Sequence, residues 1–153
     1  MKRTFNSHSA RQTRALGARL GRILEPGDII CLFGQLGAGK TVFTRGIARG
    51  IGVDPDAVTS PSFVLLHVHT GTRMPLYHFD FYRLSSAGGI LRTGYEEYLH
   101  SDGVSAIEWP ERLGYLLPDA YLKVSFGTGK ERLRRRLVFG AHGKRYRSIL
   151  EAL

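Results

Sequence analysis

Eight consecutive residues carry the clearest chemical signal in the chain, because residues 34–41 read Gly-Gln-Leu-Gly-Ala-Gly-Lys-Thr. This order fills every fixed position of the phosphate-binding loop G-x-x-x-x-G-K-[ST]. Glycines let successive backbone N–H groups curve around a polyphosphate, where a Cβ would obstruct them. The Lys40 ammonium can then lie between the β- and γ-phosphates, and the Thr41 hydroxyl can hold Mg²⁺. The predicted nucleotide ligands are Gln35, Leu36, Gly37, Ala38, Gly39, Lys40, Thr41 and Val42.

The segments that flank this loop favour a functional loop over a chance match in a glycine-rich chain. Residues 28–33 form a short apolar run that predicts a buried strand. After the loop, Phe43 and Ile47 stand four residues apart, as they would in a helix. A strand, a glycine-rich loop and a helix, in that order, aim a helix N-terminus at an anion.

Two carboxylates at the ends of later apolar runs are candidates for the second half of the site. Asp80 follows residues 76–79, and Glu108 follows residues 104–107. Open α/β sheets collect ligand groups at the carboxyl ends of their strands. Either carboxylate can bind the metal, directly or through water, while the other orients a water nucleophile. We expect Glu108 to orient the water and Asp80 to lie in the metal shell, and the reverse assignment stays open. The alternative for each is a structural role, as a turn or cap for Asp80 and as a surface cap for Glu108.

The elements that must position these groups alternate between strands and helices. We expect strands at residues 2–6, 28–33, 104–109, 120–126 and 132–139, a hairpin from 62–69 and 73–80, and a turn at 127–129. We expect helices from Ser7 or Ser9 to about Leu24 and at 41–49 and 145–153, with short helices around 95–100 and after Pro110. This alternation predicts an α/β fold of the P-loop NTPase type, with a mostly parallel sheet, antiparallel edge strands and flanking helices.

Length and composition set further limits on the protein. A chain of 153 residues predicts one domain over residues 1–153. No apolar run approaches the roughly 20 residues of a membrane span, and the first residues lack the apolar core of a signal peptide. A cytoplasmic protein is therefore expected. The single cysteine, Cys31, can form neither an internal disulfide nor a zinc cluster.

Positive charge is concentrated in two stretches of the chain, whose formal net charge is +9. From residue 121 onward nine Lys or Arg residues face two Glu residues, a net charge of +7. The first predicted helix adds Arg11, Arg14, Arg19 and Arg22. These charges indicate either a surface for RNA or an acidic protein, or a solvated basic face that keeps the protein dissolved.

Four side chains have two interpretations each. His78 shares a strand face with Asp80, where it either forms a hydrogen bond behind the site or packs. Trp109 either stacks on a base or a partner or packs at the core or sheet edge. Arg135 has the parity of the apolar residues of its strand, which indicates a bulge or a place at the rim. His67 favours a polar strand face over a zinc site, because only His69 is near it in sequence.

A missing motif bears on the identity of the nucleotide. The chain contains one asparagine, Asn6, so it lacks the Asn-Lys-x-Asp guanine-reading motif of small GTPases. ATP is therefore favoured over GTP.

Four blocks together resemble the TsaE family, formerly called YjeE, of bacterial ATPases in the tRNA threonylcarbamoyladenosine pathway. The phosphate loop is followed by Ser-Pro-Ser-Phe at 60–63, His-Phe-Asp-Phe-Tyr-Arg at 78–83 and Ile-Glu-Trp-Pro at 107–110. The blocks occur in the family's order and spacing, and the resemblance runs from Thr13 to about Phe139. Gln35 stands where the family usually has Asp, and Ser62 stands where it has Thr.

The resemblance implies a small ATPase that uses ATP and Mg²⁺ to support the partners TsaB and TsaD. These partners attach a threonylcarbamoyl group to adenosine 37 of tRNAs that read ANN codons. Any contact of this chain with tRNA is expected to be indirect, and neither DNA nor a membrane is an expected partner.

Residue roles also follow from the resemblance. The implied metal ligands are Thr41, Asp80 and Glu108, and the implied catalytic residues are Lys40, Asp80 and Glu108. Thr13 is expected near the base, and Ser60 and Ser62 in a switch-like loop near the γ-phosphate. Arg132, at the start of the last predicted strand, is a further candidate for nucleotide binding. Two other functions remain open, a small-molecule kinase built on the same loop and a nucleotide-gated RNA-binding module.

Overall fold

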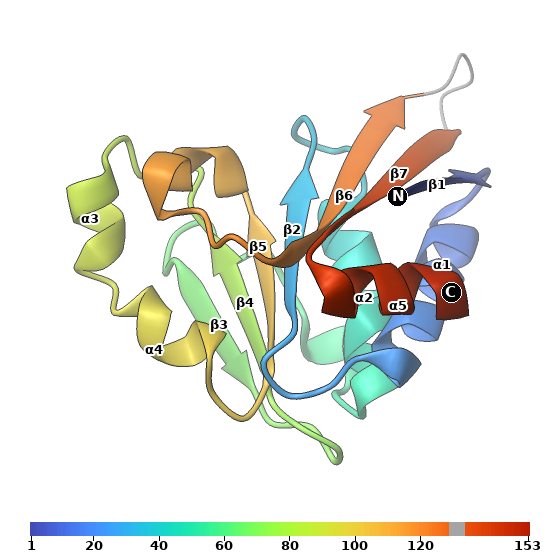
Figure 1. The fold of residues 1–153 in the computed structure, drawn as a ribbon, viewed down its shortest axis with the longest axis horizontal. Helices are drawn as coiled ribbons and strands as arrows, with labels where there is room; N and C mark the ends of the chain where they lie inside the picture. Colours follow the sequence, from blue (N-terminus) through green and yellow to red (C-terminus); the bar gives the residue numbers. More distant parts are fainter. Residues whose placement is uncertain (129–133) are drawn as a thin grey trace.

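Seven strands form one sheet at the centre of the molecule in a computed structural model, which describes residues 1–128 and 134–153 (Figure 1). The strand order across the sheet is β1-β7-β6-β2-β5-β4-β3. The strands are β1 (Lys2–Ser7), β2 (Ile29–Phe33), β3 (Leu66–His69), β4 (Leu76–Asp80), β5 (Val104–Glu108), β6 (Tyr121–Thr128) and β7 (Arg135–His142).

The four inner strands are parallel, and the pairings outside them are antiparallel. β2 pairs in parallel with both β5 and β6, and β5 pairs in parallel with β4. β3 pairs antiparallel with β4 on one side, while β7 and β1 complete the other side with antiparallel pairs. The carboxyl ends of β2, β4 and β5 therefore meet at one edge, where the loop after β2 begins.

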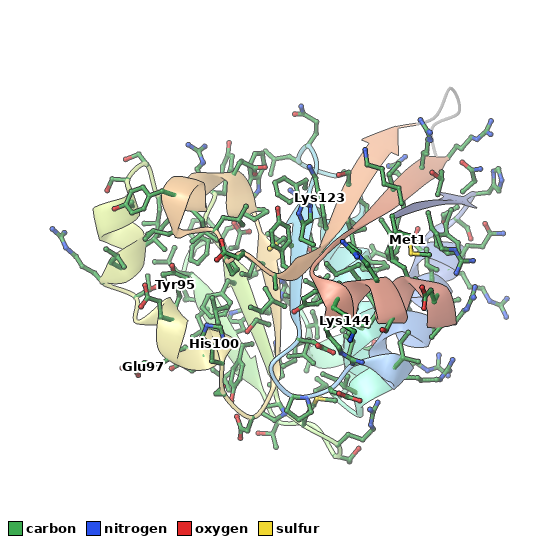
Figure 2. All side chains as sticks on the ribbon, viewed as in Figure 1. Met1, Tyr95, Glu97, His100, Lys123 and Lys144 are labelled. Carbon is green, nitrogen blue, oxygen red and sulfur yellow. The ribbon has the colours of Figure 1, made fainter. Side chains whose placement is uncertain are left out.

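Helices cover both faces of the sheet. They are α1 (Ala10–Ile23), α2 (Lys40–Ile51), α3 (Ala87–Leu91), α4 (Tyr95–Leu99) and α5 (Lys144–Ala152), with short 3₁₀ helices η1 (Pro55–Ala57) and η2 (Pro110–Leu116). Alternate residues of β2 point to opposite faces. Ile30 and Leu32 join a core with α1, α2 and α5, whereas Ile29 and Cys31 join one with α3, α4 and η2. Side chains fill the space on both faces (Figure 2).

Glycines bring α1 and α2 into close contact. A Cβ at Gly46 would lie 2.2 Å from the Arg14 carbonyl oxygen, and one at Gly17 would lie 2.4 Å from the Phe43 carbonyl oxygen. Gly21 and Gly50 approach the facing helix as closely, one turn further along. Only residues without a side chain permit this backbone separation. The two helices therefore pack as one unit behind the phosphate loop.

The predicted α/β architecture, edge strand, hairpin and flanking helices are confirmed, with two corrections to boundaries. The predicted turn at 127–129 is wrong where residues are described, because Gly127 and Thr128 pair with Arg136 and Arg135 as part of β6. The predicted start of the last strand, Arg132, lies outside the described residues. The first hairpin strand begins at Leu66 rather than at 62, because the Pro61 carbonyl accepts turn hydrogen bonds from the next residues.

A membrane span is not found among the helices of the described residues, since none is both long and apolar enough to cross a bilayer.

Candidate nucleotide-binding site

The loop between β2 and α2 has the backbone that its glycines predict. Gly37 has a φ of 75° and Gly39 a φ of 103°, a region that L side chains rarely adopt. Open space surrounds the position of a Cβ at both residues. α2 begins directly after Gly39 without a side-chain cap, so its first N–H groups remain available to an anion.

The Lys40 side chain is held inside the loop rather than extended into water. The residue is only 5% exposed, and its Nζ donates a hydrogen bond of 2.6 Å to the Gly34 carbonyl oxygen. The same Nζ lies 4.1 Å from the centre of the Trp109 ring, a cation–π contact. Burial lowers the pKa of Lys40 below its ordinary value, while Glu108 and other nearby carboxylates act in the opposite direction.

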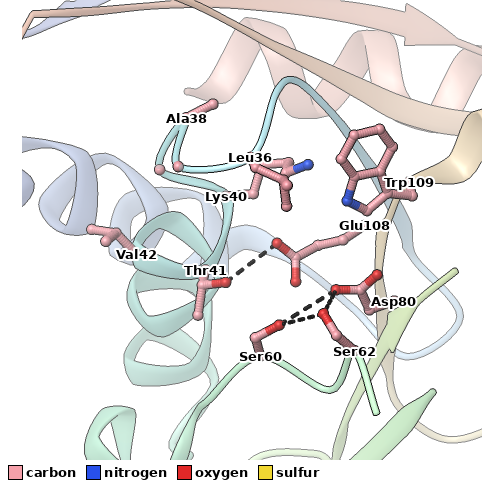
Figure 3. Close-up of a pocket in the computed structure, with 12 residues that line it drawn as sticks. Leu36, Ala38, Lys40, Thr41, Val42, Ser60, Ser62, Asp80, Glu108 and Trp109 are labelled. Carbon is pink, nitrogen blue, oxygen red and sulfur yellow. Dashed lines mark hydrogen bonds between the residues drawn. The ribbon is translucent and has the colours of Figure 1, made fainter. Parts of the chain in front are cut away.

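The two predicted carboxylates are brought together opposite the loop. Asp80 and Glu108 are the last residues of β4 and β5, stand side by side in register, and are both buried. Glu108 Oε1 accepts a hydrogen bond of 3.3 Å from the Thr41 hydroxyl (Figure 3). Two strands distant in sequence thus deliver both acids to the start of α2.

Asp80 is linked to the loop that follows η1. Its Oδ2 accepts hydrogen bonds from the hydroxyls of Ser62 at 2.8 Å and Ser60 at 3.4 Å (Figure 3). Its Oδ1 accepts one of 2.9 Å from the backbone N–H of Tyr82. The carboxylate is therefore fixed by its own turn and connected to the predicted switch-like loop.

His78 lies behind Glu108 as a hydrogen-bonding partner. Its side chain is fully buried, and its Nε2 is 2.8 Å from Glu108 Oε2. The hydrogen-bonding interpretation of His78 is therefore confirmed. A carboxylate held on both sides, by His78 and Thr41, keeps one orientation.

Most of the predicted site residues line one cavity of about 310 Å³. Its walls consist of Leu36, Gly37, Ala38, Gly39, Lys40, Thr41, Val42, Ser60, Ser62, Asp80, Glu108 and Trp109. Thr13 lies outside it, in a neighbouring hollow of about 130 Å³ that shares Gly37, Gly39 and Val42 with the larger one. Gln35 is exposed and lines neither cavity, although its carbonyl accepts the Ala38 N–H. Arg132 lies outside the described residues.

Arg135 is a loop contact that the sequence did not identify. Its Nε donates 3.1 Å to the Ala38 carbonyl oxygen, and its NH2 group donates 3.4 Å to that of Gly37. It also lines the hollow that contains Thr13. Its parity in the strand predicted a bulge or the rim, and the structure places it at the rim, at the first residue of β7. The contact of Arg135 with the phosphate loop depends on the place of β7 in the strand order of the sheet, which the sequence does not reveal.

Comparisons with known proteins agree with this geometry. The family model described as "Threonylcarbamoyl adenosine biosynthesis protein TsaE" matches residues 7–137. A Treponema pallidum tRNA threonylcarbamoyladenosine biosynthesis protein TsaE is 43% identical over 119 residues, which are 78% of this chain and 87% of the relative. The Bacillus subtilis protein of the same name is 35% identical over 142 residues, 93% of this chain and 87% of the relative.

The fold also matches a solved structure. The crystal structure of B. subtilis YdiB superposes with a TM-score of 0.82 at 30% sequence identity, over 99% of this chain and 93% of that one. A family match over residues 7–137, relatives that share most of their length and the shared fold support a single conclusion: this chain belongs to the TsaE family of tRNA threonylcarbamoyladenosine biosynthesis proteins.

Proposed function

We propose that this chain binds ATP with Mg²⁺ and hydrolyses it slowly, in support of a TsaB–TsaD pair that forms threonylcarbamoyladenosine at position 37 of tRNAs reading ANN codons. One observation carries the proposal. Lys40, Thr41, Asp80 and Glu108, which come from three distant stretches of sequence, line one cavity at the N-terminus of α2. The kinase alternative requires a second substrate site in addition to this cavity, and the RNA-module alternative gives the two carboxylates that line it no chemical role.

The loop fits a nucleotide polyphosphate. Gly37 and Gly39 leave open space where side chains would stand, and unpaired N–H groups of α2 face the same cavity. The Lys40 ammonium, now hydrogen-bonded to the Gly34 carbonyl, needs only a small movement to reach phosphate oxygens. The hollow beside Thr13, on the other side of the shared loop, is the proposed place of the base.

The oxygen atoms opposite the loop fit magnesium bound together with a nucleotide. Mg²⁺ prefers oxygen ligands and is usually held by one or two carboxylates plus phosphates. Thr41 and Glu108 already share a hydrogen bond, and Asp80 lines the same cavity. Among the described residues no group of three or more His, Cys, Asp or Glu is arranged to hold a metal alone. Phosphate oxygens and water would complete the shell of an ion held by these residues, and the ion would supply charge neutralisation at the β- and γ-phosphates.

The hydrogen bonds favour a division of roles between the two acids. Glu108 contacts Thr41 and is fixed by His78, which suits a metal-side ligand. Asp80 contacts Ser60 and Ser62, which suits a group that orients the attacking water when the loop closes. This division reverses the one expected from sequence, in which Glu108 orients the water and Asp80 lies in the metal shell.

The loop that bears Ser60 and Ser62 is well placed to respond to a partner. Phe63 is 81% exposed and Val64 is 59% exposed, directly beside the serines that contact Asp80. Large exposed apolar side chains near a site are typical of interaction surfaces. A partner that covers Phe63 would also fix Ser62 and Asp80. Hydrolysis is therefore expected to be slow in the isolated chain and faster in the complex.

The experiment measures ATP hydrolysis by this chain alone, with the TsaB–TsaD pair, and with the pair plus tRNA. The proposal expects a low rate alone and a higher rate with the pair. A full rate in the isolated chain, or no hydrolysis under any of the three conditions, would contradict it. Phe63→Ser is expected to lower the stimulated rate while it leaves ATP affinity unchanged.

A further inference from the structure

A basic groove of about 730 Å³ runs along the outer surface of α1 and α2, away from the carboxylates of the nucleotide site. Its floor consists of small apolar residues, namely Ala10, Ala15, Ala18 and Val42. Six arginines form its walls, and we call this feature the arginine groove: Arg11, Arg14, Arg19, Arg22, Arg45 and Arg49.

The close packing of the two helices creates this concentration of charge. Because Gly17 and Gly46 allow the backbones to touch, arginines from both helices border the same groove. Arg73 fixes the far end, since its guanidinium donates to the carbonyl oxygens of Gly21, Leu24 and Gly50 at 2.9–3.1 Å. The arrangement is therefore a property of the folded helix pair and not of either helix alone.

The positive charge of the groove is not balanced by acidic side chains. Neither α1 nor α2 contains an Asp or Glu. Within the part of the chain that the structure describes, none of the six arginines forms an ion pair with an Asp or Glu side chain. Arg45 donates a hydrogen bond to the Val58 carbonyl oxygen, and Arg19 donates one to an oxygen of Leu153, the last residue. Six like charges around one hollow repel one another, and a polyanion would remove that cost.

We propose that the arginine groove binds the phosphate backbone of an RNA. Arginine presents a planar set of donors that matches phosphate oxygens in pairs, and it is the preferred residue for nucleic-acid backbones. The chain belongs to a family named for the modification of tRNA, so the polyanion at hand is RNA. The ATPase role proposed above does not require this chain to contact RNA. Direct RNA binding by the arginine groove would therefore be an additional function.

The lining of the groove favours a nucleic acid over an acidic protein. Stable protein interfaces place aromatic or large aliphatic anchors at their centre. The residues of the groove include no aromatic side chain and nothing apolar larger than Val42. Guanidiniums over a shallow floor of small residues suit a backbone that is recognised by charge alone. Val42 also lines the nucleotide cavity, so the bound RNA would lie beside the ATP site.

The test measures binding of a labelled, unmodified tRNA transcript to the full chain by fluorescence anisotropy, without nucleotide and at several salt concentrations. The groove variant replaces three exposed arginines: Arg11→Gln, Arg22→Gln and Arg49→Gln. The matched control removes three positive charges from the equally basic C-terminal region: Arg136→Gln, Lys144→Gln and Arg147→Gln. Lys144 begins α5 and does not line the arginine groove.

The groove variant is expected to bind the transcript at least about tenfold more weakly than the unchanged chain at 150 mM salt. Its plot of log affinity against log salt should be shallower by about 0.7–0.9 for each lost phosphate contact. The control should stay within about twofold. An unchanged unfolding midpoint verifies that the triple variant is folded. If the triple variant is not folded, the single variant Arg49→Gln is tested in its place.

Three results would overturn the proposal. They are no binding of the transcript by the unchanged chain, an equal loss in both variants, and tighter binding of polyglutamate than of the transcript. The last result would assign the groove to an acidic protein instead. Because ATP is absent, failure of the proposed ATPase function would leave this measurement unaffected.

Discussion

Lys40 and the arginine groove represent opposite ways of placing positive charge in one small protein. Lys40 is buried, hydrogen-bonded to Gly34, stacked beneath Trp109 and surrounded at longer range by carboxylates. The six arginines of the groove have no Asp or Glu partner among the described residues. The first cation has a fixed position that suits the proposed chemistry, whereas the second set produces a diffuse positive field that suits the proposed attraction of RNA.

The difference follows from the cost of burial. A single buried cation is tolerable when hydrogen bonds and nearby negative charge compensate for lost water. Six cations cannot be buried together, so they remain hydrated and depend on a ligand for neutralisation. Changes at Lys40 should therefore act on catalysis, and changes in the groove on salt-sensitive binding.

The largest expected effect comes from removing the buried cation. Lys40→Ala should reduce ATP hydrolysis by roughly 10²–10³-fold, because one preorganised charge at the phosphates is lost. ATP affinity, measured by calorimetry, should also fall. Lys144→Ala, which removes an exposed lysine from α5, is the control and should leave both unchanged. Equal rates of ATP hydrolysis in the two variants would exclude a catalytic role for Lys40.

The second prediction distinguishes the two carboxylates. Glu108→Gln should raise the Mg²⁺ concentration that gives half-maximal ATP hydrolysis, because the variant weakens the metal-side ligand beside Thr41. Asp80→Asn should lower the maximal rate by about 10²-fold with little change in that Mg²⁺ concentration. A magnesium titration of hydrolysis measures both. The opposite pattern would restore the assignment in which Glu108 orients the water.

The third prediction concerns the contact that creates the groove. Gly46→Ala places a Cβ about 2.2 Å from the Arg14 carbonyl oxygen, so α1 and α2 must separate. We expect a loss of about 1–3 kcal/mol in the free energy of unfolding, together with weaker RNA binding. Gly88→Ala is the matched control, since no atom lies within 4 Å of its Cβ position. Denaturant unfolding measures both variants.

A smaller effect is expected at Arg135, which holds the loop from outside. Arg135→Ala removes the donors to the Ala38 and Gly37 carbonyl oxygens. The loop should become less ordered before ATP binds. The affinity for ATP should fall by about three- to tenfold, which corresponds to the net free energy of roughly one typical hydrogen bond. Arg136→Ala, at the next, exposed position of β7, should bind ATP like the unchanged chain.

The smallest effect concerns pH and His69, a histidine that lines neither the nucleotide cavity nor the arginine groove. Burial lowers the pKa of His69, and the neighbouring His78 and His67 act in the same direction. Because its pKa is lower in the folded than in the unfolded protein, His69 binds a proton more readily after unfolding. The stability that the neutral His69 contributes to the fold is therefore complete above the unfolded-state pKa of about 6.5 and is lost as the pH falls below it. His69→Gln should therefore flatten the decline of the unfolding midpoint between pH 7 and pH 5. An identical decline in the variant would exclude His69 as the cause.

Much of the fold and of the candidate site follows from local sequence. The apolar runs ending in Asp80 and Glu108 predicted strands, and both residues stand at the ends of neighbouring parallel strands. Such predictions succeed because a buried strand needs a continuous apolar run and a phosphate loop needs its glycines. The cavity walls named from sequence, apart from Gln35, Thr13 and Arg132, are the walls that the structure brings together.

Features that depend on distant packing were beyond the sequence. The reach of Arg135 to the phosphate loop depends on the order of β7, β6 and β2 in the sheet. The arginine groove depends on glycines of two helices meeting at backbone distance, and periodicity within one helix does not contain that information. The extension of β6 through Gly127 depends on its partner β7. A glycine predicts a turn from local sequence, but hydrogen bonding to a neighbouring strand can keep it within a strand.

One contact of the nucleotide site gives the protein an intrinsic optical signal. Trp109 is the only tryptophan in the chain, and the Lys40 ammonium lies against its ring. Indole emission is sensitive to a nearby charge, so a shift of this ammonium toward an arriving anion should change the fluorescence of the protein. Binding at the loop should then be measurable in real time in the unlabelled protein, without a reporter dye or a substituted residue.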